Sequence, residues 1–173
     1  MRINVKRLNS EDTVENLKKY LSKYEHNALI KSEYSAENLF LSELNDKFFP
    51  KYGIGIVAHN YYLPKILLLK GRVLVGFDNN VYVFDGNLLL NNKKTSISPF
   101  YDFVSYLEHK IIILIFEIDI IGISAISGNQ LWKIAVNDII TNYKKLNGTL
   151  GIKTFEGQKI EIDILNGNSK MII

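Results

Sequence analysis

The chain has 173 residues, of which 47% are hydrophobic, and a net charge of +3. This length and composition suit one compact domain with a sizeable core and argue against long disordered segments. The absence of cysteine excludes disulfides and thiolate metal sites, and the mild positive charge lies well below that of a typical nucleic-acid-binding domain.

The first 31 residues predict a short edge strand and then a helix. Residues 2–8 alternate between polar and apolar side chains, as a strand does. Asp12 and Glu15 have the spacing of a capping pair. The apolar residues that follow recur at three- and four-residue steps, as in one buried helical stripe: Val14, Leu17, Leu21 and Tyr24. The N-terminus lacks the apolar run of a signal peptide, so we expect the protein to stay in the cytoplasm.

The segment 35–49 is compatible with a helix or with a strand. Leu39 and Leu41 alternate with polar neighbours, as in a strand. A second apolar set recurs at four-residue steps and slightly favours a helix: Ala36, Phe40, Leu44 and Phe48. Either element ends at Pro50, because proline lacks a backbone donor and restricts the residue before it.

From Tyr52 onward the chain predicts short strands separated by turns. The clusters Asp78-Asn79-Asn80 and Asp85-Gly86-Asn87 favour turn geometry. The strands expected around them are Gly53–Ala58, Lys65–Lys70, Val73–Phe77, Val81–Phe84 and Leu88–Leu90. The simplest arrangement of these strands is an antiparallel meander.

The segment Ile111–Ile126 is almost entirely apolar, yet it does not predict a membrane helix. It is shorter than the about 20 residues of a membrane span, and Glu117 and Asp119 would each cost about 2.5 to 3.5 kcal/mol near the centre of one. Its β-branched residues favour two core strands instead, with a bend at Gly122. At positions i and i+2 of a strand the two acidic side chains share a face, which we interpret as the solvent face.

The C-terminal third also predicts strands. Trp132 follows the turn 127–129 and is expected in the core, and strict alternation places Ile160, Ile162 and Ile164 on the core face of a late strand. Three segments, FDGNLLL, ISGNQLW and FEGQKIE, each set a small turn before a strand. Their spacings of 42 and 29 residues are unequal, which argues against a true repeat array.

Together these elements predict a mainly β (α+β) fold in a single domain over residues 1–173. We expect an antiparallel meander that forms a β-sandwich or a curved sheet, with an N-terminal helix; a propeller-like arrangement is the alternative. A helical extension would cover about 1–50 and the β-rich body about 51–173.

The sequence contains no catalytic or metal-binding motif. The histidines His26, His59 and His109 do not have metal-ligand spacing, and no nucleophile elbow, P-loop or complete dinucleotide-binding motif occurs. We therefore expect no catalytic residue, no metal and no cofactor. The alternatives are a hydrolase that uses His59 or the Glu117 and Asp119 pair, and a carbohydrate- or small-ligand-binding β module.

Tyrosines and acidic residues at predicted loops and strand ends are the candidates for binding a partner protein. Tyrosine offers a large contact area at little entropic cost, and acidic groups add charge complementarity. The candidate partner-binding residues are Tyr61, Tyr62, Tyr101, Asp102, Tyr106, Glu108, Glu117 and Asp119.

The order of motifs resembles that of small β-rich bacterial proteins, among them immunity proteins of contact-dependent growth inhibition and other toxin delivery systems. The motifs are KYGIGIV, VLVGFDNNVYVFD, SPFYDF, LIFEIDIIGIS, SGNQLWKIAVNDII and TFEGQKIEIDILNG, over roughly residues 50–167. The resemblance implies a cytoplasmic protein that covers a functional surface of a cognate toxin domain, for example a nuclease, without contacting nucleic acid or membrane. Immunity proteins against nucleases are often acidic, whereas this chain is slightly basic, so a local acidic patch would have to make the contact.

Overall fold

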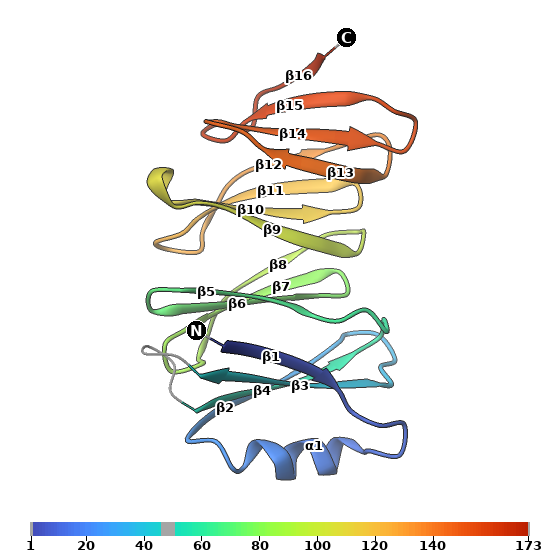
Figure 1. The fold of residues 1–173 in the computed structure, drawn as a ribbon, viewed down its shortest axis with the longest axis vertical. Coiled ribbons are helices and arrows are strands. Elements are labelled where there is room, and N and C mark those ends of the chain that lie inside the picture. Colours follow the sequence, from blue (N-terminus) through green and yellow to red (C-terminus); the bar gives the residue numbers. More distant parts are fainter. Residues whose placement is uncertain (1, 46–50, 173) are drawn as a thin grey trace. The chain divides into compact units, whose positions relative to one another are not determined.

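The computed structural model describes residues 2–45 and 51–172 (Figure 1). Within these ranges the chain forms four four-stranded sheets, one α-helix and one short 3-10 helix. It divides into two compact units, the first ending at Lys93 and the second beginning at Lys94. No helix in the described ranges is long and apolar enough to cross a membrane.

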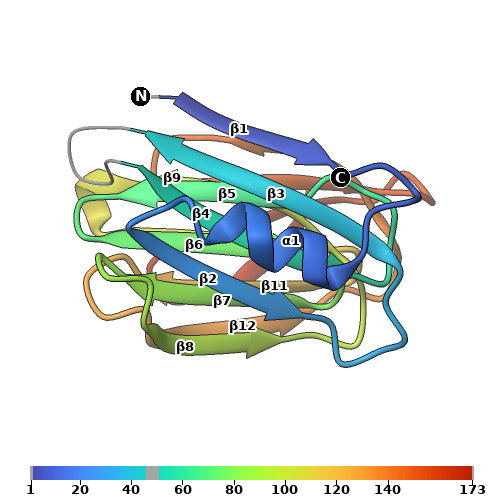
Figure 2. The same ribbon diagram turned by 90° about the horizontal axis from the view of Figure 1, so that it is seen from below.

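The first sheet has the strand order β1-β3-β4-β2, with β2 and β4 parallel and the other neighbours antiparallel. Its strands are β1 (Arg2–Arg7), β2 (His26–Lys31), β3 (Asn38–Asn45) and β4 (Tyr52–Ala58). Helix α1 (Val14–Leu21) lies across one face of this sheet (Figure 2) and buries Leu17 and Leu21 there. The predicted helical stripe is confirmed, although the residue that caps the helix is Thr13 rather than Asp12.

The helix favoured over residues 35–49 is wrong where the structure describes that segment, because 38–45 form strand β3. Phe48 and Pro50 lie outside the described residues. Both faces of β3 are covered: Leu39 and Leu41 pack beneath α1, and Phe40 lies in the core on the opposite face. A strand that is apolar on both faces loses its alternation, so its apolar spacing can imitate that of a helix.

The predicted helical extension over about 1–50 is also wrong, because the described part of it contributes three strands to the sheet that holds β4. That sheet and the second one share a core in the first unit. The single-domain assignment stays a prediction, since two compact units can belong to one domain.

The other three sheets are antiparallel meanders. The second consists of β5 (Lys65–Leu69), β6 (Arg72–Phe77), β7 (Asn80–Asp85) and β8 (Leu90–Thr95). The third consists of β9 (Phe100–Tyr106), β10 (Ile111–Phe116), β11 (Asp119–Ser124) and β12 (Gln130–Ala135), with the 3-10 helix Leu107–His109 after β9. The fourth consists of β13 (Ile140–Lys145), β14 (Thr149–Thr154), β15 (Lys159–Asp163) and β16 (Ser169–Ile172).

The mainly β fold with an N-terminal helix and antiparallel meanders is confirmed. Each of these three meanders forms a separate sheet of four strands in chain order. Propeller blades have this topology, which was the alternative predicted from the sequence. The strand pair expected within Ile111–Ile126 is β10 and β11, joined by residues 117–118.

These meanders are repeats of one design. Asp85, Ser124 and Asp163 each begin the turn between the third and fourth strands, and they lie 39 residues apart. In all three turns the first residue both donates its backbone N–H and accepts a backbone N–H within the turn. Of the three similar segments in the sequence, FDGNLLL and ISGNQLW span this turn, whereas FEGQKIE joins the second and third strands of the fourth sheet. The unequal spacing came from that mismatch.

In the second unit, Trp132 on β12 connects the third sheet to the fourth. Its indole Nε1 donates a hydrogen bond of 2.8 Å to the backbone oxygen of Ile164. The ring lies so close to Gly122 and Gly167 that a Cβ atom built on either glycine would come within 3.0 Å of it. The expected core position of Trp132 is confirmed, as is the inward direction of Ile162 in β15.

Candidate functional site

Three linkers lead into the first strands of the meanders, and each exposes apolar side chains. The first linker (59–64) precedes β5, the second (96–99) precedes β9 and the third (136–139) precedes β13. Their exposed apolar residues are Tyr61, Tyr62 and Leu63 in the first, Ile97 in the second and Ile139 in the third. Ile97 is 80% exposed, so it contributes almost nothing to the core.

The backbone of the first linker is held in place by a buried carboxylate. The backbone N–H groups of His59 and Asn60 each donate a 2.9 Å hydrogen bond to Asp78, in the turn between β6 and β7. The rings of Tyr61 and Tyr62 lie 4.5 Å apart at the exposed tip, and their side chains are 62% and 65% exposed. The backbone is therefore held while the aromatic surface faces outward.

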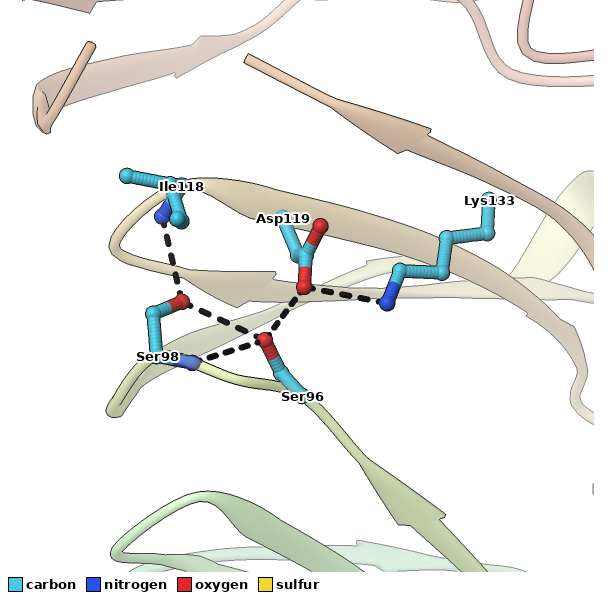
Figure 3. Close-up of polar contacts among 5 residues, drawn as sticks. All are labelled: Ser96, Ser98, Ile118, Asp119 and Lys133. Carbon is cyan, nitrogen blue, oxygen red and sulfur yellow. Dashed lines mark hydrogen bonds and ion pairs between the residues drawn. The ribbon is translucent and has the colours of Figure 1, made fainter. Parts of the chain in front are cut away.

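The second linker is fixed by a polar cluster beneath it (Figure 3). The Ser96 hydroxyl donates to Asp119 and accepts the backbone N–H of Ser98 at 3.1 Å. The Lys133 Nζ forms an ion pair with the same Asp119 oxygen at 3.0 Å. Ile118 N donates to the Ser98 hydroxyl at 3.3 Å, which ties the linker to the turn between β10 and β11.

The third linker is fixed at both sides. Its Val136 N–H donates to Ile118 O at 2.8 Å, in the turn between β10 and β11. Asp138 accepts the backbone N–H of Glu156 at 2.7 Å, from the turn between β14 and β15. This hydrogen bond is the main reason that the pKa of Asp138 lies below its ordinary value, so its carboxylate stays charged.

These linkers are suited to binding rather than to bond chemistry. Ser96 and Ser98 are only 5% exposed, so a substrate could not reach their hydroxyl groups. Among the described residues, the imidazole of His59 has no hydrogen bond or ion pair with a carboxylate or hydroxyl side chain, and its Nδ1 lies 2.8 Å from the backbone oxygen of Ser35. Within the described ranges, no three acidic or histidine side chains gather as a metal site would require. What the linkers offer is exposed apolar surface on a fixed backbone.

The interpretation of Glu117 and Asp119 as a pair on the solvent face of a strand is wrong. Glu117 lies in the turn before β11 and is half-buried, whereas Asp119 is 3% exposed and bonds to Ser96 and Lys133. The sequence pattern could not show that the second linker covers this end of β11. Asp119 therefore holds the linker and is not available to a partner.

The remaining predicted residues fall into different surroundings. Tyr61 and Tyr62 lie at the tip of the first linker, and Glu108 is exposed on the 3-10 helix. Tyr106 is fully buried, and its hydroxyl donates to Thr149 O at 2.6 Å, so it is a core residue and not a surface anchor.

Tyr101 and Asp102 lie on β9 beside the first strand of the fourth sheet. The Tyr143 hydroxyl on β13 donates to Asp102 at 2.8 Å, and its ring meets that of Tyr101 edge to face at 6.1 Å. Nearby, Lys145 Nζ donates to Ser105 O at 2.6 Å. These contacts join two sheets of the second unit, so the structure gives Asp102 a packing role.

Tyr143 is expected to ionise only at strongly alkaline pH. Burial, followed by the hydrogen bond to Asp102, raises the pKa of its phenol to about 12, compared with about 10 for an ordinary tyrosine. The folded state then holds this proton more tightly than the unfolded state, so its contribution to stability is complete below about pH 10 and declines as the pH rises through about 12. A tyrosinate absorbance titration should lose one late step in Tyr143→Phe; an unchanged late amplitude would contradict this assignment.

Sequence reasoning missed Ile97, Ile139 and Phe155, which are exposed at the second linker, the third linker and the turn between β14 and β15. Ile97 stands between two serines and before Pro99, and such an isolated apolar residue in a polar turn is the signal that could have found it. Phe155 directly precedes the turn residues Glu156 and Gly157. In the structure it is 77% exposed.

Comparisons with known proteins find similarity at the level of the fold. The designed protein Ika8 is 14% identical, with a TM-score of 0.54 over 78% of this chain and 46% of its own. The propeller-like BamB from Moraxella catarrhalis is 12% identical, with a TM-score of 0.53 over 84% of this chain and 48% of its own. Sqt1 from Saccharomyces cerevisiae is 10% identical, with a TM-score of 0.53 over 80% of this chain and 45% of its own.

This chain therefore spans less than half the length of each of these structures, and at such identities the likeness concerns the fold alone. No protein-family model and no curated protein matches the sequence.

Proposed function

We propose that this protein acts by binding another protein through its linkers and covering a functional surface of that partner, without catalysing a reaction. The observation that carries the proposal is the repeated combination of an anchored backbone and exposed apolar side chains in all three linkers. Fixed loops lose little conformational freedom on binding, so more of the contact energy remains as affinity. Tyrosine is, with tryptophan and arginine, one of the residue types enriched among those that dominate such contacts.

For the partner we propose a toxin domain, in keeping with the resemblance to immunity proteins of contact-dependent growth inhibition. The protein would then act in the cytoplasm of the toxin-producing cell and of its siblings, where it would block the toxin, for example a nuclease. Of the eight residues predicted from the sequence, Tyr61 and Tyr62 remain the best candidates for this contact, because both are exposed on an anchored linker.

The test is a binding assay with the product of the adjacent upstream gene, which this proposal expects to contain the toxin domain. At least one of two variants, Tyr61→Ser in the first linker and Ile97→Ser in the second, should weaken the complex by about tenfold or more in affinity. The matched control is Ile126→Ser, another exposed isoleucine, in the turn between β11 and β12 at the other end of the sheet that follows the second linker. Calorimetric titration that finds no complex with the unaltered protein, or equal affinity for all variants, would refute the proposal.

A further inference from the structure

The second unit has one edge where two linkers and two turns are joined by backbone hydrogen bonds. Glu117 N donates to Pro99 O at 2.9 Å, and Ile140 N donates to Glu117 O at 2.7 Å. Phe155 N donates to Ile139 O at 2.8 Å, which continues the row. We call residues 96–99, 117–118, 136–139 and 155–158 the linker edge.

The linker edge carries exposed apolar side chains at three places along this row. Ile97, Ile139 and Phe155 come from different segments, and each exposes roughly half or more of its side chain. Each sits in a linker or turn that the hydrogen bonds above hold in place. The apolar surface therefore has a fixed shape, as a docking surface requires.

The charge of the linker edge is entirely negative. Its four segments contain Glu117, Asp138 and Glu156 and no lysine, arginine or histidine, although the whole chain has a net charge of +3. Among the described residues no ion pair involves Glu117 or Glu156. Two carboxylates thus flank the apolar side chains and lack an internal cation.

We propose that the linker edge binds a protein segment that combines large apolar side chains with lysine or arginine. This inference rests on the proposed function. It specifies the chemistry of the partner surface that the second and third linkers would contact. The apolar side chains would supply contact area, and Glu117 and Glu156 would pair with the basic groups at the rim. An acidic segment or a nucleic acid would be repelled by the same carboxylates.

The probes for the experiment are two synthetic amphipathic peptides of equal length, one of leucine and lysine and the other of leucine and glutamate. Because the protein is positive overall, non-specific attraction would favour the glutamate peptide. We expect the lysine peptide to bind at least about tenfold more tightly in calorimetric titration, and the preference to shrink as the salt concentration rises.

Three variants locate the binding. Glu117→Lys/Glu156→Lys should abolish the preference for the lysine peptide, and Phe155→Ser should weaken its binding. Glu11→Lys, which changes an exposed acid between β1 and α1, outside the linker edge, should leave it unchanged. Glu117→Gln/Glu156→Gln, which keeps side-chain size, replaces the lysine variant if circular dichroism shows that the latter is unfolded.

Equal affinity for the two peptides, or a preference that survives the double variant, would overturn the inference. The assay contains no toxin domain, so its outcome is separate from that of the proposed function. A toxin domain that does not bind, together with a lysine peptide that behaves as expected, would refute the proposed partner and leave the linker edge as a binding surface. The reverse outcome would refute only the inference.

Discussion

Replacing Trp132 with alanine should lower the free energy of unfolding by about 3 to 5 kcal/mol, the usual cost of removing a large aromatic side chain from a core. The indole fills the space between the third and fourth sheets, and its Nε1 satisfies the backbone oxygen of Ile164. Alanine would leave a cavity and an unpaired carbonyl. Chemical denaturation followed by circular dichroism measures the loss.

Two further variants separate the contributions of Trp132. Trp132→Phe keeps a ring but loses the N–H donor, and should cost less than the alanine variant, with about 1 to 3 kcal/mol from the unsatisfied carbonyl. Gly122→Ala attacks the same contact from the other side, because its Cβ would lie 2.2 Å from Cε2 of the indole.

The matched control is Leu131→Ala, next to Trp132 in β12 but 50% exposed, which should change the stability by no more than about 0.5 kcal/mol. If the free energy of unfolding of Trp132→Ala lay within about 1 kcal/mol of that of the unaltered protein, the prediction that the indole is a major core contact would be contradicted.

Replacing Asp119 with alanine should cost about 2 to 3 kcal/mol, because hydrogen bonds to a charged group contribute about 1.5 to 3 kcal/mol and the partners left behind are desolvated. The carboxylate accepts from the Ser96 hydroxyl and pairs with Lys133. Without it the second linker loses its anchor, so we expect faster proteolytic cleavage near Ile97 as well as a lower denaturation midpoint.

Asp119→Asn should fall between the alanine variant and the unaltered protein, because the amide can still accept the serine hydroxyl but cannot form an ion pair. Glu117→Ala is the matched control, since it removes an acid two residues away that is half-buried in the turn. If Asp119→Ala and Glu117→Ala were equally harmless in both urea unfolding and proteolysis, the polar cluster would not be what holds the linker.

The three linkers combine a similar anchor with different exposed residues. A buried carboxylate, Asp78 or Asp119, holds each of the first two linkers, and in the third the carboxylate comes from the linker itself, at Asp138. The anchoring groups are similar, whereas the exposed residues differ from linker to linker. Contact residues can therefore change without loss of the scaffold.

The sequence by itself determined that this protein is built mainly of strands. The β-branched residues of Ile111–Ile126 and the alternation at Ile160, Ile162 and Ile164 are local properties, because they follow from how each strand exposes its two faces. The apolar stripe of helix α1 could be predicted from the sequence because one face of α1 packs on the sheet and the other faces solvent.

Only the tertiary structure decided the identity of β3, the environment of Asp119 and the surface at the linkers. β3 is covered on both faces, so its pattern carried no period that could separate strand from helix. The sequence pattern places Asp119 on the solvent face of a strand, but Ser96, 23 residues away in sequence, covers its carboxylate. The 39-residue repeat became visible once the turns were placed, because strand pairing and not sequence spacing makes Asp85, Ser124 and Asp163 equivalent.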